Sequence, residues 1–167
     1  MNTLIPVDGS PASMRAVRHV LRQHARLGLQ GRVTLLSVQP VLYRHIARRL
    51  PRAELAAYRE SRARDSLAPA IALLRDAGVP YRALVAEGPI GQAVLDEAER
   101  IGADQIVLGV RRKPAWQRAL LPSISRDVLD GATIPVAVLN DGSPSPLSRF
   151  ALPAGIGIGL TALMLVD

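Results

Sequence analysis

Short apolar runs alternate with longer, periodically apolar segments along the first 140 residues of the chain. The short runs are rich in Val, Leu and Ile, which is typical of strands buried in a parallel sheet. In the longer segments apolar residues recur every three or four positions, the spacing of amphipathic helices. The pattern predicts five strands, at residues 3–7, 32–38, 81–86, 105–108 and 134–139, with a helix after each of the first four.

Helix boundaries are indicated by residues with particular backbone preferences. Ser10 followed by Pro11 predicts an N-cap and a first helical residue, and Pro51 and Gly88-Pro89 indicate two further helix starts. A last helix is expected to begin near Ser123. Because parallel neighbouring strands need helical crossovers, the alternation predicts one α/β domain with a mostly parallel sheet and helices on both faces.

Composition limits the chemistry that the chain can carry. About half of the 167 residues are hydrophobic but only 3% are aromatic, so the core must consist of Ala, Val, Leu and Ile. No cysteine is present, and the three histidines, at positions 19, 24 and 45, lack metal-ligand spacing. The first residues have no basic, long apolar leader, so we expect a cytoplasmic protein.

The net charge of +7 comes almost entirely from arginine. Such a charge favours association with nucleic acid, anionic lipid or acidic partners. Arginine that simply covers solvated helix faces is the alternative interpretation. We expect no specific nucleic-acid partner.

Four segments resemble the universal stress protein (UspA-like) family, in the right order over residues 1–140. They are LIPVDGSPAS at 4–13, GPIGQAVLDEA at 88–98, ADQIVLG at 103–109 and LLPSISRDVLDGATIPVAVL at 120–139. The resemblance implies a doubly wound, five-stranded parallel sheet in the order 3-2-1-4-5. It also implies a homodimer joined along strand Ile134–Leu139.

Family members that bind ATP carry a loop of the form G-x2-G-x9-G-[ST] after the fourth strand. Here the first glycine is Gly109 and the hydroxyl residue is Ser123, but Arg112 and Pro122 replace the other two glycines. Glycine lets the backbone approach a phosphate closely, and proline has no N–H to donate. The sequence therefore predicts that the phosphate loop is damaged, although Ser123 and the amides after it could still bind an anion.

Other candidate site residues also follow from the resemblance. Asp8 resembles the acidic residue near the base and ribose, and Val38 the position whose backbone contacts the base. Their alternative roles are a helix-start residue and a core strand end. Arg111 and Arg112, followed by Lys113, could bind an anion with their side chains, or could form a solvated basic loop.

No motif of a known catalytic class is present, so we expect a protein that is not an enzyme. The resemblance favours a regulatory homodimer that acts through contacts with an unknown protein partner, with no cofactor and with weak or absent ATP binding. The alternative is a stress-response module that binds an adenine nucleotide such as ATP through the basic loop.

The end of the chain differs from the family pattern. Residues 141–150 are rich in Pro, Ser and Gly and read as a linker, and residues 151–167 form an apolar tail. Sixteen residues, Ala151–Val166, contain no charge. As a helix they would reach only about 24 Å, short of the roughly 30 Å hydrocarbon core of a membrane. We expect this segment to contact a membrane peripherally or a partner subunit. The alternative is a tail that packs on its own domain or its dimer mate, or one that is disordered and prone to aggregate.

Overall fold

The computed structural model describes residues 1–28, 31–39, 52–110 and 124–140, and it contains one sheet of five strands. The strands are β1 (Asn2–Pro6), β2 (Arg32–Gln39), β3 (Tyr81–Glu87), β4 (Gln105–Gly109) and β5 (Val136–Leu139). The helices are α1 (Pro11–Leu27), α3 (Arg52–Asp76), α4 (Ile90–Arg100) and α6 (Ile124–Gly131).

The strand order is β3-β2-β1-β4-β5 and every pair is parallel. This confirms the predicted topology, and the predicted boundaries are within two residues of the observed ones. The largest difference is at β5, which begins at Val136 rather than at Ile134. The Pro135 carbonyl accepts a hydrogen bond from the Ile106 amide, but proline has no N–H of its own to donate.

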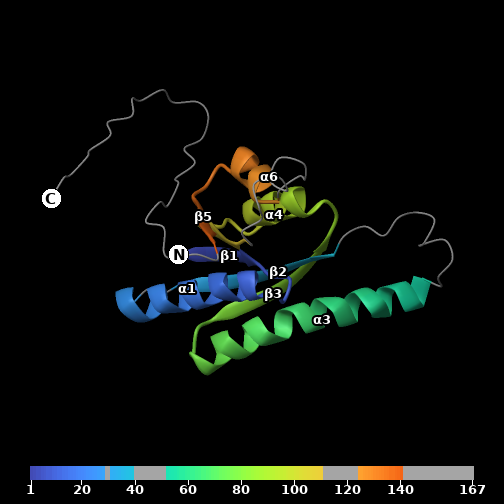
Figure 1. Ribbon diagram of the computed structural model, residues 1–167, viewed down its shortest axis with the longest axis horizontal. Helices are drawn as coiled ribbons and strands as arrows, with labels where there is room; N and C mark the ends of the chain where they lie inside the picture. The colour runs from blue at the N-terminus through green and yellow to red at the C-terminus, as the bar shows by residue number, and fades with distance from the viewer. Residues whose placement is uncertain (29–30, 40–51, 111–123, 141–167) are drawn as a thin grey trace.

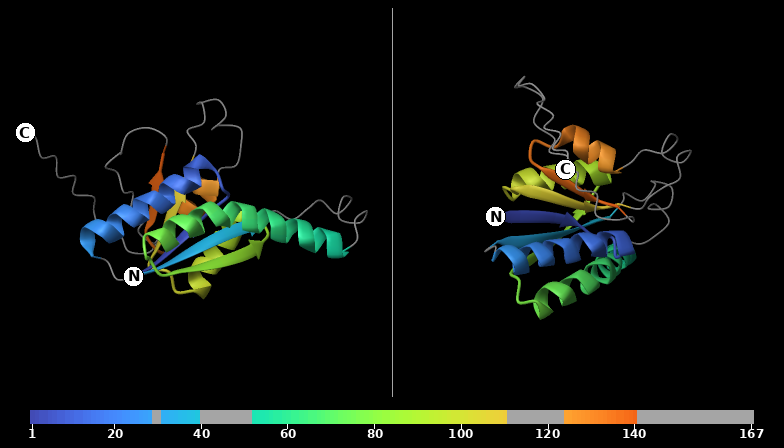
Figure 2. Two further views of the ribbon diagram at one scale, coloured as in Figure 1. Left: turned by 90° about the horizontal axis from the view of Figure 1, so that it is seen from below. Right: turned by 60° about the vertical axis from the view of Figure 1, so that its left-hand side comes forward.

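Of the four helices that the structure describes, two cover each face of the sheet (Figures 1 and 2). On one face, α1 and α3 enclose a cluster that includes Ile5, Val17 and Leu35. On the other face, α4 and α6 enclose a cluster that includes Val94 and Val128. The central strands are buried on both sides, which explains why their sequences are almost continuously apolar.

The turn from β1 into α1 shows why the first helix begins where it does. The Ser10 side-chain oxygen accepts a hydrogen bond from the Ser13 amide at 3.3 Å, and Pro11 occupies the first helical position. These are the N-cap and N1 roles predicted from the sequence. At the other end, Gly28 adopts φ +57°, a left-handed conformation that glycine tolerates well.

Helix α3 is much longer than the strands that it covers. Its 25 residues correspond to about 38 Å at 1.5 Å per residue. Its N-terminal end extends past the carboxyl end of the sheet, as Figures 1 and 2 show. Its second half packs on the sheet through Leu67, Ala70 and Leu74.

Part of the predicted organisation lies outside the described residues, namely the linker 141–150 and the tail 151–167. None of the helices within the described ranges is long and apolar enough to cross a membrane.

We predict that Ser10→Ala lowers the free energy of unfolding by about 1 kcal/mol, because the Ser13 amide loses its acceptor at the helix start. Ser61→Ala, on the exposed surface of α3, is the matched control and should change stability little. Chemical denaturation measures both variants. An equal stability for S10A and the wild type would show that the cap contributes nothing.

Candidate functional site

Three of the predicted site residues lie at the carboxyl ends of three neighbouring strands. Asp8 follows β1, Val38 lies near the end of β2 and Gly109 ends β4. Strand β2 lies on one side of β1 and strand β4 lies on the other, so the strand order reverses between β1 and β4. Ligands of doubly wound sheets bind where the strand order reverses in this way, so the structure brings these three positions to the expected edge.

The Asp8 side chain holds the turn between β1 and α1. One of its carboxylate oxygens accepts a hydrogen bond from the Ser10 amide at 2.9 Å. Burial alone would raise the pKa of Asp8, but hydrogen bonds from Ser10 and Ser13 outweigh it, so the pKa lies below its ordinary value. Asp8 is thus an ionised helix-start residue at neutral pH, and its side chain is still exposed to solvent.

The backbone of Val38 faces the space beyond the end of β1. The Leu36 carbonyl accepts a hydrogen bond from the Val7 amide at 2.8 Å, so Leu36 directs its backbone groups toward β1. Backbone direction alternates along a strand, and Val38 therefore directs its N–H and C=O to the same side. The last paired residue of β1 is Pro6, opposite Leu36. The half-buried side chain of Val38 packs against the cluster under α4 and α6.

Gly109 has a structural role that is independent of any ligand. A Cβ on this residue would overlap the carbonyl group of Ala12 and would lie 2.8 Å from the Ser13 amide nitrogen. Both are backbone atoms in the first turn of α1, which cannot move aside as a flexible side chain could. A side chain at position 109 would therefore push α1 away from β4.

Arg15 is a basic residue at this edge that the sequence motifs did not indicate. Its Nη2 donates a hydrogen bond to the Val110 carbonyl at 3.4 Å, across 95 positions of sequence. The contact places a half-buried guanidinium next to the residue that precedes Arg111. The sequence could not indicate this contact, because nothing in it shows that α1 passes over the end of β4.

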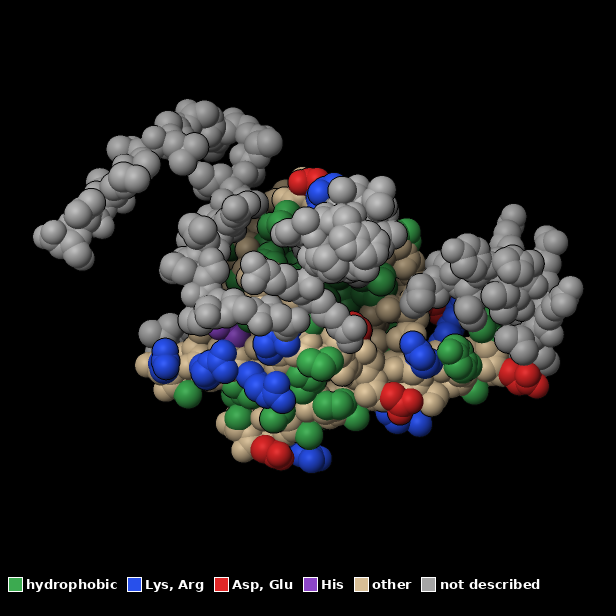
Figure 3. Space-filling model, viewed as in Figure 1, with side chains coloured by type: hydrophobic (Ala, Val, Ile, Leu, Met, Phe, Trp, Pro, Cys, Tyr) green, Lys and Arg blue, Asp and Glu red, His purple; other side chains and the backbone are tan. Residues whose placement is uncertain are grey.

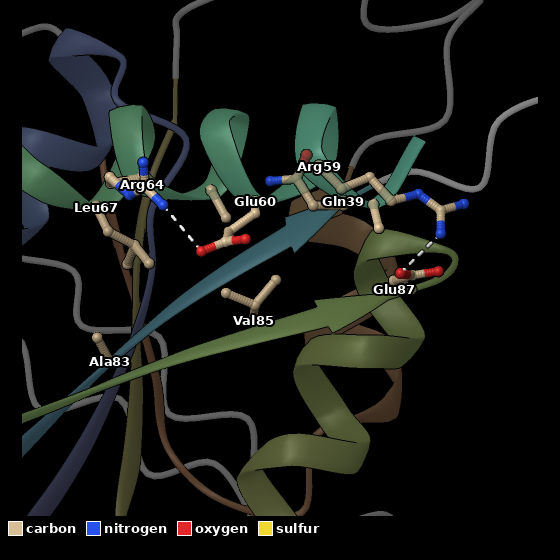
Figure 4. A pocket seen from close by; sticks show the side chains of 10 residues that line it. Gln39, Arg59, Glu60, Arg64, Leu67, Ala83, Val85 and Glu87 are labelled. Carbon is tan, nitrogen blue, oxygen red and sulfur yellow. Dashed lines mark hydrogen bonds and ion pairs between the residues drawn. The ribbon is translucent and has the colours of Figure 1, made fainter. Parts of the chain in front are cut away.

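A separate groove lies between the first half of α3 and the edge strand β3 (Figure 4). Ala83, Val85 and Leu67 line it together with two ion pairs. Arg59 contacts Glu87 at 2.9 Å, and Arg64 contacts Glu60 at 2.8 Å. Of the predicted site residues that the structure describes, Asp8, Val38 and Gly109, none lines this groove. It is a feature of the exposed β3 edge, where the Val85 side chain is 54% accessible to solvent.

Beneath α3, a partly buried polar network joins β2 to the helix near the groove. The Ser37 and Ser66 hydroxyls are 2.8 Å apart, and the Gln39 side-chain amide donates to the Ser37 hydroxyl at 2.9 Å. The Ser66 hydroxyl is also 2.9 Å from the Ala63 carbonyl, so these groups have partners. The network fixes α3 on β2.

The remaining predicted site residues lie outside the described residues: Arg111, Arg112 and Ser123, with Pro122 and Lys113 of the same loop. Within the described ranges, the acidic residues and histidines form no cluster that could hold a metal ion.

The comparisons with known proteins agree with this architecture. The model of the universal stress protein family matches residues 1–140. A universal stress protein from Burkholderia pseudomallei is 22% identical, with a TM-score of 0.62 over 83% of this chain and 94% of its own. No curated protein matches the chain.

Two similar structures contain nucleotides. A universal stress family protein from Arabidopsis thaliana with AMP bound is 17% identical, with a TM-score of 0.63 over 86% of this chain and 93% of its own. A universal stress protein in complex with cAMP is also 17% identical, with a TM-score of 0.58 over 85% and 98% of the two chains. At these identities the likeness shows a shared fold.

The parallel sheet, its 3-2-1-4-5 order and the reversal point between β1 and β4 define an α/β protein with a nucleotide-binding-like fold. With the family model matched over 140 of its 167 residues, the chain belongs to the universal stress protein family, which confirms the resemblance in its sequence.

We predict that Gly109→Ala lowers the free energy of unfolding by about 1–3 kcal/mol, because the new methyl group overlaps the Ala12 carbonyl. The loss should be the same with and without ATP, since it arises in the fold itself. Thermal unfolding under both conditions measures it. Full stability in the alanine variant would mean that the close contact between α1 and β4 is easily relaxed.

Proposed function

We propose that the protein is a regulatory member of its family that works as a homodimer through protein contacts and binds ATP weakly or not at all. The observation that carries the proposal is the pair of substitutions in the phosphate loop, Arg112 and Pro122, where ATP-binding members have glycine. No catalytic step is part of the proposed function.

The chemistry of the two replacements supports weak binding. Pro122 removes a backbone N–H that could donate to a phosphate oxygen. Arg112 adds a Cβ and a long side chain where close backbone approach is needed. Two features that the chain retains also have structural explanations. Gly109 is needed for packing against α1, and the Asp8 carboxylate stabilises the turn before it.

An adenine-nucleotide-binding module is the second candidate. It is favoured by the juxtaposition of Asp8, Val38 and Gly109 at the reversal point, and by the family proteins whose structures contain AMP or cAMP. In this case Arg111 and Arg112 would bind the phosphates by side chains instead of backbone amides. Arg15 would add positive charge at the same edge.

The edge strand β5 supports the proposed dimer. The backbone amides of Ile106 and Val110 donate to the carbonyls of Pro135 and Leu139. Pro135 and Leu139 therefore direct their backbone groups toward β4. By alternation, Val136 and Val138 direct theirs to the outer edge of the sheet. Exposed edges of this kind are commonly paired or covered, and a second copy of β5 is the partner that we propose.

The phosphate loop is tested by titrating ATP calorimetrically into the wild type and into the double variant Arg112→Gly with Pro122→Gly. We expect the double variant to bind at least about tenfold more tightly, a difference of about 1.4 kcal/mol. The matched control is Arg111→Gly with Pro114→Gly, which makes the same kinds of exchange outside the glycine positions. Tight binding by the wild type would refute the argument from the loop and support the second candidate.

The dimer is tested by Val138→Pro, which removes the outward amide of β5 without removing a hydrogen bond to β4. We expect light scattering at micromolar concentration to give a dimer for the wild type and a monomer for this variant. Val85→Pro is the matched control, because its amide points outward from the opposite edge strand, β3. A monomeric wild type, or a V138P protein that remains dimeric, would contradict the proposed interface.

A further inference from the structure

The exposed side of α1 carries a line of arginines. The helix contains four arginines and no aspartate or glutamate. Arg18, Arg22 and Arg26 follow one another at intervals of four residues, and all three are exposed. The opposite side of the helix, with Ala16, Val17 and Val20, is buried against the sheet. The three arginines, called here the α1 ridge, therefore point directly away from the core.

Among the described residues, the α1 ridge lacks the ion pairs that several arginines of other helices form. On α3 and α4, Arg59, Arg64 and Arg100 form ion pairs with nearby glutamates. In the parts of the chain that the structure describes, no ion pair involves a residue of the α1 ridge. In Figure 3 a group of basic side chains lies over α1, and no acidic side chain lies among them in that view.

A titratable neighbour responds to this charge. His19 lies on α1 between Arg18 and Arg22, and its pKa is lowered, first by burial and then by the positive charge of Arg22. The imidazole is therefore mostly neutral at pH 7. The positive charge of this surface resides in the arginines, and their exposed guanidinium groups are available to an external anion.

The chain leaves the sheet near the start of α1, the helix that carries the ridge. The Leu139 side chain, at the end of β5, packs against the cluster under α1 and α3. The Leu139 carbonyl accepts from the Val110 amide, and the Val110 carbonyl accepts from Arg15 of α1. The ten residues 141–150 can span at most about 33 Å. That reach exceeds the length of α1, about 26 Å, so the uncharged segment 151–166 can reach the level of the ridge.

We propose that the α1 ridge is a docking surface for anionic lipid headgroups, and that it holds the domain against a membrane beside the apolar segment Ala151–Val166. One short apolar anchor alone binds a membrane only marginally, and a basic patch beside it makes the attachment stable. The apolar segment and the α1 ridge would be two such attachments. A nucleic acid would match the charge of the ridge but would leave the sixteen uncharged residues unexplained.

The test is flotation of the full chain with vesicles of phosphatidylserine and phosphatidylcholine, against vesicles of phosphatidylcholine alone. We expect binding to the anionic vesicles only, and weaker binding as salt is raised. The variant R18Q/R22Q/R26Q should bind the anionic vesicles about 10- to 100-fold less tightly, since each basic residue near the surface contributes severalfold.

The matched control is R62Q/R82Q/R126Q, which removes the same charge from three exposed positions on α3, β3 and α6. It should bind within about twofold of the wild type, because these charges lie singly on three other elements and are screened. A chain truncated after Asn140 should retain weaker, salt-sensitive binding that the ridge substitutions abolish. Thermal unfolding of every variant confirms that the fold is intact.

Three results would overturn the proposal. Equal loss of binding in the ridge variant and the control would show that only net charge matters. Equal binding to both kinds of vesicle would show that the apolar segment acts alone. No binding to vesicles, together with ridge-dependent binding of a mixed-sequence RNA in the same buffer, would identify a nucleic-acid surface instead.

Discussion

The contact between Gly109 and the first turn of α1 is the constraint on which the rest of the site edge depends. A strand end and a helix start approach so closely that no Cβ fits between them. This contact brings Asp8, at the β1–α1 turn, next to the end of β4, and it brings Arg15 to the Val110 carbonyl. The reversal point of the sheet is thus built from backbone packing, before any ligand is considered.

The same contact changes how a partly retained motif is interpreted. In a phosphate loop, a glycine at position 109 would be explained by a nucleotide. Here the backbone of Ala12 and Ser13 requires glycine even in the absence of a ligand. Asp8 also has a role that needs no ligand, because its carboxylate accepts a hydrogen bond from the Ser10 amide in the turn before α1. Two residues can therefore persist for stability while Arg112 and Pro122 replace the glycines whose main use would be phosphate contact.

The distribution of charge separates two parts of the surface. Where arginine lies near glutamate, as with Arg59 and Glu87 beside the groove, the charges compensate locally and project little field. Along α1 no acidic residue is present, so the field of the ridge is uncompensated over the length of the helix.

Much of the fold was predictable from local sequence. Ser10 and Pro11 set the start of α1 through capping chemistry that involves only adjacent residues. The apolar runs of β1, β2 and β4 indicated buried parallel strands, because both of their faces are covered. The end of β5 was also predicted, but its first residue was not. Pro135 takes part in the hydrogen bonds between β5 and β4 only through its carbonyl.

For the site, the sequence determined which residue types are present: the acidic residue of the first turn, the first glycine of the loop, and the arginine and proline that replace the other two. Tertiary structure decided which of them meet. The overlap at Gly109, the contact of Arg15 with Val110 and the outward direction of the α1 ridge all arise between segments far apart in the chain. Local propensity carries no information on such contacts, because they depend on how helices pack across the sheet.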